Sequence, residues 1–170
     1  IASMPDGLGY WVVAADGGVF TYGDARNYGS LVGLHLRQPV VGIAATSDGK
    51  GYWLAAADGG VFAFGDARFA GPVAKVNLKQ RIVAIAAAGG GGYWLAGADG
   101  GVFAFGGAGF YGSMGRHSGP HPVVGIVASP YGLGYWLARS DGEVIGFGSA
   151  RLEALADAVT QTVAVVAIAS

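Results

Sequence analysis

Four aspartates occupy equivalent places in four similar segments of the chain, and carboxylates in such numbers can bind a metal ion or act as general acid and base. They are Asp16, Asp58, Asp99 and Asp141. Each is followed by glycine, and three of them by two glycines. Asp-Gly is typical of tight β-hairpin turns, because both residues tolerate the backbone angles of the turn. We therefore assign these aspartates to turn geometry and predict no metal site, no cofactor and no catalytic residue.

Three histidines are the other side chains that could ligate a metal or act in catalysis. His35, His117 and His121 lie in linkers between the similar segments, and only the last two share a linker. A zinc site would need further ligands that converge from other segments. The chain has no cysteine, and its linear sequence supports no Ser-His-Asp arrangement. The histidines therefore predict neither a metal centre nor a nucleophilic site.

Tyr-Trp pairs begin the four segments, and both rings can stack on sugars and anchor protein partners. The tryptophans are Trp11, Trp53, Trp94 and Trp136, and they are all the tryptophans of the chain. We expect them in the core, among Phe and Val side chains. The tyrosines start their strands near one face of the assembly, where their hydroxyls can remain in water. The candidate ligand-binding residues are Tyr10, Tyr52, Tyr93 and Tyr135.

The segments are copies of one unit, which reads YWLAAADGGVFAFG from Tyr52 to Gly65. Successive copies are 42, 41 and 42 residues apart. A fixed period of this size indicates an array of blades or solenoid turns. Two apolar runs rich in aromatic and β-branched residues flank each Asp-Gly, so each unit predicts a β-hairpin.

The hairpin register decides which side chains share a face. With Asp16-Gly17 as a two-residue turn, Val13 pairs with Phe20 and Trp11 with Tyr22, which places these four on one bulky face. The opposite, slimmer face carries Tyr10 and Val12, with Val19 and Thr21 across from them. Neither face is polar, so each hairpin must be covered on both sides. We therefore expect the copies to stack face to face.

The complete period adds a slim apolar strand before each hairpin and a weaker outer strand after it. The slim strands, such as the one in 40–51, are rich in glycine and alanine and suit the crowded centre of a radial assembly. The outer strands are expected in 24–30, 66–72 and 107–113. The sequence thus predicts an all-β protein, a β-propeller built from four blades of four strands and about 42 residues each.

The predicted blades form one domain over residues 1–170. The repeats cover about 10–51, 52–92, 93–134 and 135–170. A last slim strand at 163–169 has no hairpin of its own and is expected to close the ring onto the first blade. Repeat arithmetic does not fix the size of the ring. It is either four-bladed or part of a larger ring formed by dimerisation.

Composition excludes some partners. The net charge of −1 gives no electrostatic reason to expect nucleic acid. No apolar run reaches the ~18 residues of a membrane span.

Ion pairs are expected between Asp24 and Arg26 and between Asp66 and Arg68. The chain opens on Ile1, which suggests a processed product or a piece of a longer protein.

The unit GYWLAAADGGVFAFGDARFAG resembles the Gly-Tyr-Trp-Leu, Asp-Gly-Gly-Val-Phe and Phe-Gly-Asp-Ala repeats of many exported or surface-attached actinobacterial proteins, where they often lie beside cell-wall or hydrolase domains. More distantly it is similar to the blades of regulator-of-chromosome-condensation type propellers. Gly107 and Ser149 depart from the pattern, since Asp24 and Asp66 occupy the same place in the first two copies. The resemblance implies a secreted or cell-surface location.

The leading functional hypothesis is a non-catalytic binding or display module that holds a protein or glycan on a ring face or on the basic linkers. The alternative is a structural spacer or assembly unit that forms homo-oligomers through its strand ends. A third hypothesis is an enzyme with its site in the central channel.

Overall fold

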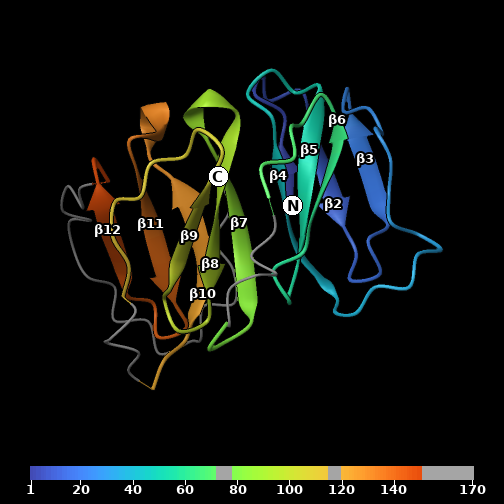
Figure 1. The fold of residues 1–170 in the computed structure, drawn as a ribbon. Helices are drawn as coiled ribbons and strands as arrows, with labels where there is room; N and C mark the ends of the chain where they lie inside the picture. Colours follow the sequence, from blue (N-terminus) through green and yellow to red (C-terminus); the bar gives the residue numbers. More distant parts are fainter. Residues whose placement is uncertain (72–77, 115–119, 151–170) are drawn as a thin grey trace.

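Four three-stranded antiparallel sheets make up the part of the chain that the computed structural model describes, residues 1–71, 78–114 and 120–150. Figure 1 shows the sheets side by side in chain order. The first contains β1 (Ala2–Ser3), β2 (Gly9–Val13) and β3 (Val19–Gly23), and the second β4 (Val40–Ala45), β5 (Gly51–Ala56) and β6 (Val61–Gly65). The third contains β7 (Ile82–Ala88), β8 (Gly92–Gly97) and β9 (Val102–Phe105), and the fourth β10 (Val123–Ala128), β11 (Gly134–Arg139) and β12 (Val144–Gly148). The short 3-10 turns η2 (Gly89–Gly91) and η3 (Pro130–Gly132) precede β8 and β11. Within these residues, no helix has the length and apolar character needed to span a membrane.

The hairpin turn is one residue longer than the sequence predicts. Gly17 N–H bonds to the Ala14 carbonyl, and Ala14 N–H bonds to the Gly18 carbonyl. The loop is therefore three residues long and ends at Gly17, whose φ of 81° is in the left-handed region. A three-residue loop that ends in such a glycine is a common hairpin connection.

The longer loop moves the register by one residue, so the predicted faces are wrong. Trp11 lies opposite Thr21, not Tyr22, and Val13 lies opposite Val19, not Phe20. A one-residue slip transfers every side chain of one strand to the other face. Tryptophan consequently shares its face with small residues, and tyrosine shares the other face with phenylalanine. The second hairpin pairs in the same way, with Trp53 opposite Ala63, Tyr52 opposite Phe64 and Leu54 opposite Phe62.

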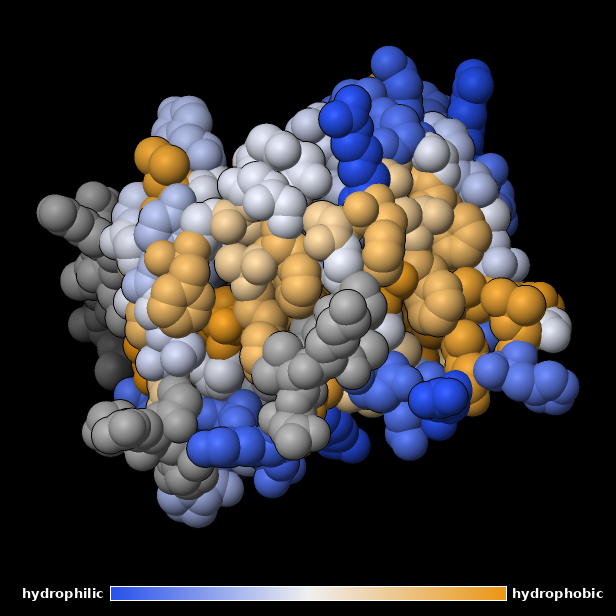
Figure 2. All heavy atoms as spheres, viewed as in Figure 1, coloured by the Kyte–Doolittle hydropathy of each residue, from blue (hydrophilic) through white to orange (hydrophobic). Residues whose placement is uncertain are grey.

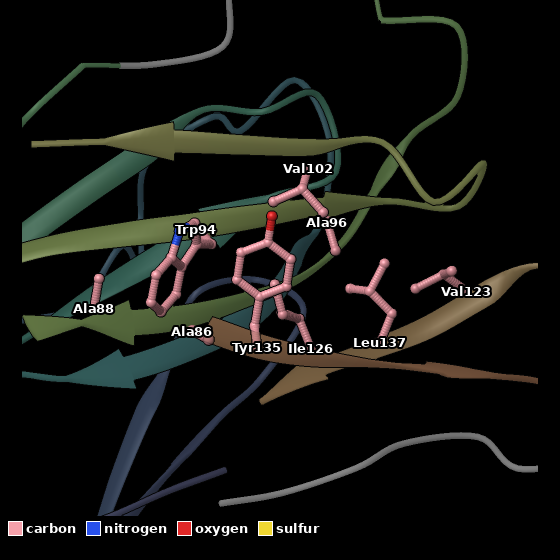
Figure 3. Close-up of a cluster of buried hydrophobic side chains, with 9 residues drawn as sticks. All are labelled: Ala86, Ala88, Trp94, Ala96, Val102, Val123, Ile126, Tyr135 and Leu137. Carbon is pink, nitrogen blue, oxygen red and sulfur yellow. The ribbon is translucent and has the colours of Figure 1, made fainter. Parts of the chain in front are cut away.

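The core consists of three clusters, each between two consecutive sheets. In each cluster the tryptophan face of one sheet packs on the tyrosine face of the next. Figure 3 shows this for Trp94 of β8 and Tyr135 of β11, whose ring centroids are 5.1 Å apart. Trp11 and Trp53 are buried in the same way. The expected core position of the tryptophans and the face-to-face stacking of the copies are confirmed for these three interfaces.

Residues of the inner strands β1, β4, β7 and β10 line one cavity of about 230 Å³. Small side chains line much of it, among them Ala44, Ala86 and Ala128. The strands β4, β7 and β10 also share a register irregularity near their first residues. The expectation that slim strands meet at the centre is therefore confirmed.

The fourth strand predicted for each of the first three blades is absent from residues 24–30, 66–71 and 107–113, and the outer segment of the fourth blade lies almost wholly outside the described residues. Backbone carbonyls of the first three segments accept hydrogen bonds from tryptophan side chains instead of from a neighbouring strand. The indole N–H groups of Trp11, Trp53 and Trp94 donate to carbonyls of the segments that follow their own hairpins, at Arg26, Arg68 and Gly109. At the edge of β3, the Asn27 side chain donates to the Val19 carbonyl. Because these bonds replace a ladder, the described sheets have three strands each. The predicted closing strand 163–169 lies outside the described residues.

Candidate functional site

The predicted ligand-binding tyrosines do not form a common surface. Tyr52, Tyr93 and Tyr135 are fully buried. Their hydroxyls donate to backbone carbonyls that follow the preceding sheet, at Gly29, Gly71 and Gly112. Burial raises the pKa of all three above the ordinary value of 10.0. The expectation that these hydroxyls remain in water is wrong, because the preceding sheet packs on the face that carries them.

Tyr10 is the exception, because no described sheet covers its face. Its side chain is 39% exposed, and its ring stacks on Tyr22 with 4.8 Å between centroids. A ligand-binding role for Tyr10 stays a prediction.

The aspartates of the hairpin turns fulfil the expected structural role. Asp16 Oδ1 accepts a hydrogen bond of 2.9 Å from Gly18 N–H. Asp58, Asp99 and Asp141 make the same bond to the residue two positions ahead. Within the described ranges there is no group of three or more His, Cys, Asp and Glu side chains placed to hold a metal.

The predicted pairs of Asp24 with Arg26 and of Asp66 with Arg68 do not form among the described residues. The ion pairs present there join Lys50 to Asp48, and Arg139 to both Asp141 and Glu143. Asp66 instead lies 3.1 Å from the Thr46 hydroxyl. These pairs therefore connect neighbouring residues of single loops and do not join one sheet to the next.

A pocket opens where the loops before β5, β8 and β11 meet, and we call it the loop-face pocket. Its volume is about 540 Å³, and its lining includes Thr46, Asp48, Asp66, Arg68, Gly89 and Tyr131. Opposite charges, a hydroxyl and an aromatic ring thus border one hollow. Such a combination can bind a ligand by hydrogen bonds and by ring stacking.

Tyr131 is the most unusual residue of this pocket. It is 94% exposed, and its φ of 68° makes it the one non-glycine residue with a positive φ in the described part of the chain. Gly132 N–H bonds to the Ser129 carbonyl, which closes a turn with Pro130 and Tyr131 at its centre. Pro at the second position and positive φ at the third define a type II turn, whose third residue is normally glycine. Tyrosine at that place costs about 1–2 kcal/mol.

Hydrogen bonding favours the ionised form of Asp48 in the loop-face pocket. The Lys50 backbone N–H donates to Asp48, and this bond is the main cause that holds the pKa of the Asp48 carboxyl below its ordinary value. The buried Thr46 hydroxyl lies within hydrogen-bond distance of Asp48, of Asp66 and of the Gly51 carbonyl. One hydroxyl hydrogen serves one acceptor at a time, so carboxylate lone pairs remain available to a ligand.

Tyr131 is not among the site residues that the sequence predicts. The signal lies in the comparison of the repeats, because Asp6 and Asp48 occupy the equivalent position in the loops before the first two hairpins. In the fourth loop the sequence Ser-Pro-Tyr-Gly also places proline where a type II turn favours it. A tyrosine that replaces a turn residue in one copy of a repeat therefore indicates a local function.

The stacked sheets around a common centre define a β-propeller fold. No family model matches the chain, and no curated protein shows significant sequence similarity to it. Among solved structures, the C-terminal WD40 domain of Sif2 is similar, with a TM-score of 0.51, 19% identity, and coverage of 86% of this chain and 42% of that chain. The β-propeller domain of Cps50 (Swd1) from Myceliophteria thermophila gives a TM-score of 0.51 at 9% identity, and covers 86% of this chain and 50% of that chain. The chain thus spans about half the length of these two WD40-type propellers.

Proposed function

We propose that this chain is a non-catalytic binding module that holds a protein partner at the loop-face pocket. The observation that carries the proposal is Tyr131, a strained and exposed aromatic residue beside charged side chains. Backbone strain persists where the surrounding structure maintains it, and it concentrates at functional sites. The similarity to WD40-type propellers supports the fold on which this module is built.

The chemistry of the pocket favours a peptide-like ligand. Arg68 offers donors, Asp48 and Asp66 offer acceptors, and the exposed ring of Tyr131 offers a stacking surface. A polypeptide segment presents carbonyls, amides and side chains of both charges, so it can use all of these groups. A neutral glycan would use the ring and the carboxylates, and it is the alternative ligand.

Binding selections with a matched pair of variants test the proposal. A phage-displayed peptide library and a glycan array are screened with the intact chain, then with Tyr131→Gly and Leu133→Ala. We expect peptides that lose at least tenfold in affinity for Tyr131→Gly but bind Leu133→Ala normally. Leu133 is a suitable control because it is exposed and lies two residues away. Glycan hits with the same dependence would establish the alternative, and hits that ignore Tyr131 would contradict a site at this pocket.

We also propose that the module belongs to an exported or cell-surface protein. The support is the resemblance of its repeats to those of exported actinobacterial proteins. Protease treatment of intact cells that produce the full-length protein tests this location. Degradation of the repeat region is expected, and full protection of that region would contradict the proposal.

A further inference from the structure

The first sheet leaves open a face that the other sheets bury. Phe20 and Tyr22 are 56% and 47% exposed, and Tyr10, which stacks on Tyr22, is 39% exposed. In the second sheet the residues at the same places are Phe62, Phe64 and Tyr52, and the first sheet packs on them. We call the exposed set Tyr10, Val12, Phe20 and Tyr22 the open tyrosine face. In each of the following sheets, the equivalent surface forms the interface with the preceding sheet.

The partner of a tyrosine face is the same at all three interfaces that the structure describes. A tryptophan from the preceding sheet contacts the tyrosine, with centroid distances of 5.7, 5.5 and 5.1 Å. Small or β-branched residues accompany it, such as Ala55 and Val61. The open tyrosine face thus fits a sheet that presents one tryptophan among small residues.

The fourth sheet presents such a surface. Trp136 lies opposite Gly146, and Ala138 lies opposite Val144. Trp136 and Val144 are half-buried, whereas their equivalents Trp94 and Val102 are buried against the next sheet. We call this set the terminal tryptophan face. It retains exposed area at the two positions that are covered in the preceding sheet.

We propose that the open tyrosine face of one copy binds the terminal tryptophan face of a second copy, and that two such contacts close a ring of two chains. The contact continues, between chains, the interface that repeats three times within one chain. Each face is complementary to the other and not to itself, so the association is head to tail. A head-to-tail contact forms a closed assembly when the rotation per subunit is right and a filament when it is not. The coverage of about half of each WD40-type propeller matches a ring of two chains.

The apolar surface supplies the driving force. Removal of apolar surface from water favours association, and exposed apolar patches mark interaction sites. Figure 2 shows one side of the row of sheets, where apolar residues gather in a band across the middle and hydrophilic residues lie toward the upper and lower rims. The open tyrosine face is not the surface in this view, and its exposure is given by Tyr10, Phe20 and Tyr22. The open tyrosine face belongs to β2 and β3, at one end of the row of sheets.

Light scattering on the intact chain over a range of concentrations tests the association. We expect a mass of twice the 17.0 kDa of one chain. Phe20→Glu is expected to reduce it to one chain, because a carboxylate would be buried at the contact. Phe110→Glu is the matched control, since Phe110 is similarly exposed but lies outside both faces. A chain that is monomeric at all concentrations, or a dimer that survives Phe20→Glu, would refute the proposal.

Cysteine cross-linking tests the orientation of the contact between the two copies. The introduced cysteines are the only thiols, because the chain has no cysteine of its own. Phe20→Cys and Val144→Cys are prepared separately and treated with a short thiol cross-linker, alone and mixed. Cross-linked dimer is expected in the mixture and not in either sample alone. Cross-linking of Phe20→Cys to itself would mean that two open tyrosine faces meet, which contradicts the head-to-tail contact. Peptide binding at Tyr131 is measured on the same variants, so failure of one proposal is distinguishable from failure of the other.

Discussion

The Tyr52 hydroxyl donates a hydrogen bond of 2.6 Å to the Gly29 carbonyl, which joins the second sheet to the segment that follows the first. The Tyr28 N–H also donates to this hydroxyl, at 3.1 Å. Gly29 has a φ of 139°, and a Cβ there would overlap the Phe64 ring. One tyrosine therefore satisfies two backbone groups of a segment that has no strand partner. The same tyrosine-to-glycine bond recurs at the next two interfaces.

Removal of this hydroxyl should destabilise the fold. Tyr52→Phe leaves the Gly29 carbonyl and the Tyr28 N–H unpaired in the interface, and we expect a loss of about 1–3 kcal/mol in the free energy of unfolding. Tyr131→Phe is the matched control, because the Tyr131 side chain is 94% exposed and lies outside the interfaces between sheets, and its effect should stay within about 0.5 kcal/mol. Urea denaturation of the two variants measures the difference. Equal stability of both would show that the interface bond contributes nothing.

Stability should fall at alkaline pH. Burial raises the pKa of Tyr52, Tyr93 and Tyr135 in the folded state. These hydroxyls therefore bind their protons more tightly in the folded state than in the unfolded state. Their contribution is fully present below the unfolded pKa near 10 and is lost as pH rises through the folded pKa. Urea midpoints between pH 8 and pH 11 measure the decline. The triple Phe variant should show a shallower decline, and an unchanged slope would assign the effect to other groups.

Substitution of glycine at the end of a hairpin strand should be severe. Gly65 has a φ of 67°, and a Cβ there would overlap the Lys50 carbonyl oxygen. Gly65→Ala is expected to cost several kcal/mol, well above the ~1–2 kcal/mol of left-handed strain alone. Gly33→Ala is the control, because Gly33 has a φ of 86° but no atom near its added Cβ. Thermal melting of both variants separates the effect of atomic overlap from that of backbone strain. Similar losses of stability in the two variants would contradict the close approach of Gly65 to the Lys50 carbonyl.

Relief of strain at Tyr131 should stabilise the protein. Tyr131→Gly is expected to raise the free energy of unfolding by about 1 kcal/mol, because glycine adopts a positive φ without penalty. Tyr131→Ala should give no comparable gain, since alanine retains the strain. Calorimetry of both variants measures this. A destabilised Tyr131→Gly would indicate that the ring packs on the fold instead of projecting from it.

The hairpin aspartates should contribute to stability only through their hydrogen bonds in the turn. Asp58 accepts a hydrogen bond of 3.0 Å from Gly60 N–H. Asp58→Ala removes the acceptor and should cost about 1 kcal/mol, whereas Asp58→Asn retains an acceptor oxygen and should cost less. Chemical denaturation ranks the two variants. If Asn were as harmful as Ala, the charge of the carboxylate and not its hydrogen bond would be the important property.

Most of the architecture follows from the local sequence. The Tyr-Trp and Val-Phe runs predict the hairpins, and the alanine-rich runs predict the inner strands at the centre. The register was mispredicted because Asp-Gly occurs in two-residue and in three-residue loops, and the position of Gly17 in its turn decides between them. Gly17 thereby reverses the faces of Tyr10 and Trp11 relative to their partner strand, and Gly59 does the same for Tyr52 and Trp53.

The sequence by itself determined the repeat, the sheets and their need for cover on both sides, because period and apolar character are properties of neighbouring residues. Only the tertiary structure decided that Tyr52 is an interface residue while Tyr10 stays exposed, because the two similar units differ in whether another sheet packs on the tyrosine. It also decided that the loops carrying Asp48 and Tyr131 border one pocket. Residues 83 positions apart meet there because the sheets converge on a common centre.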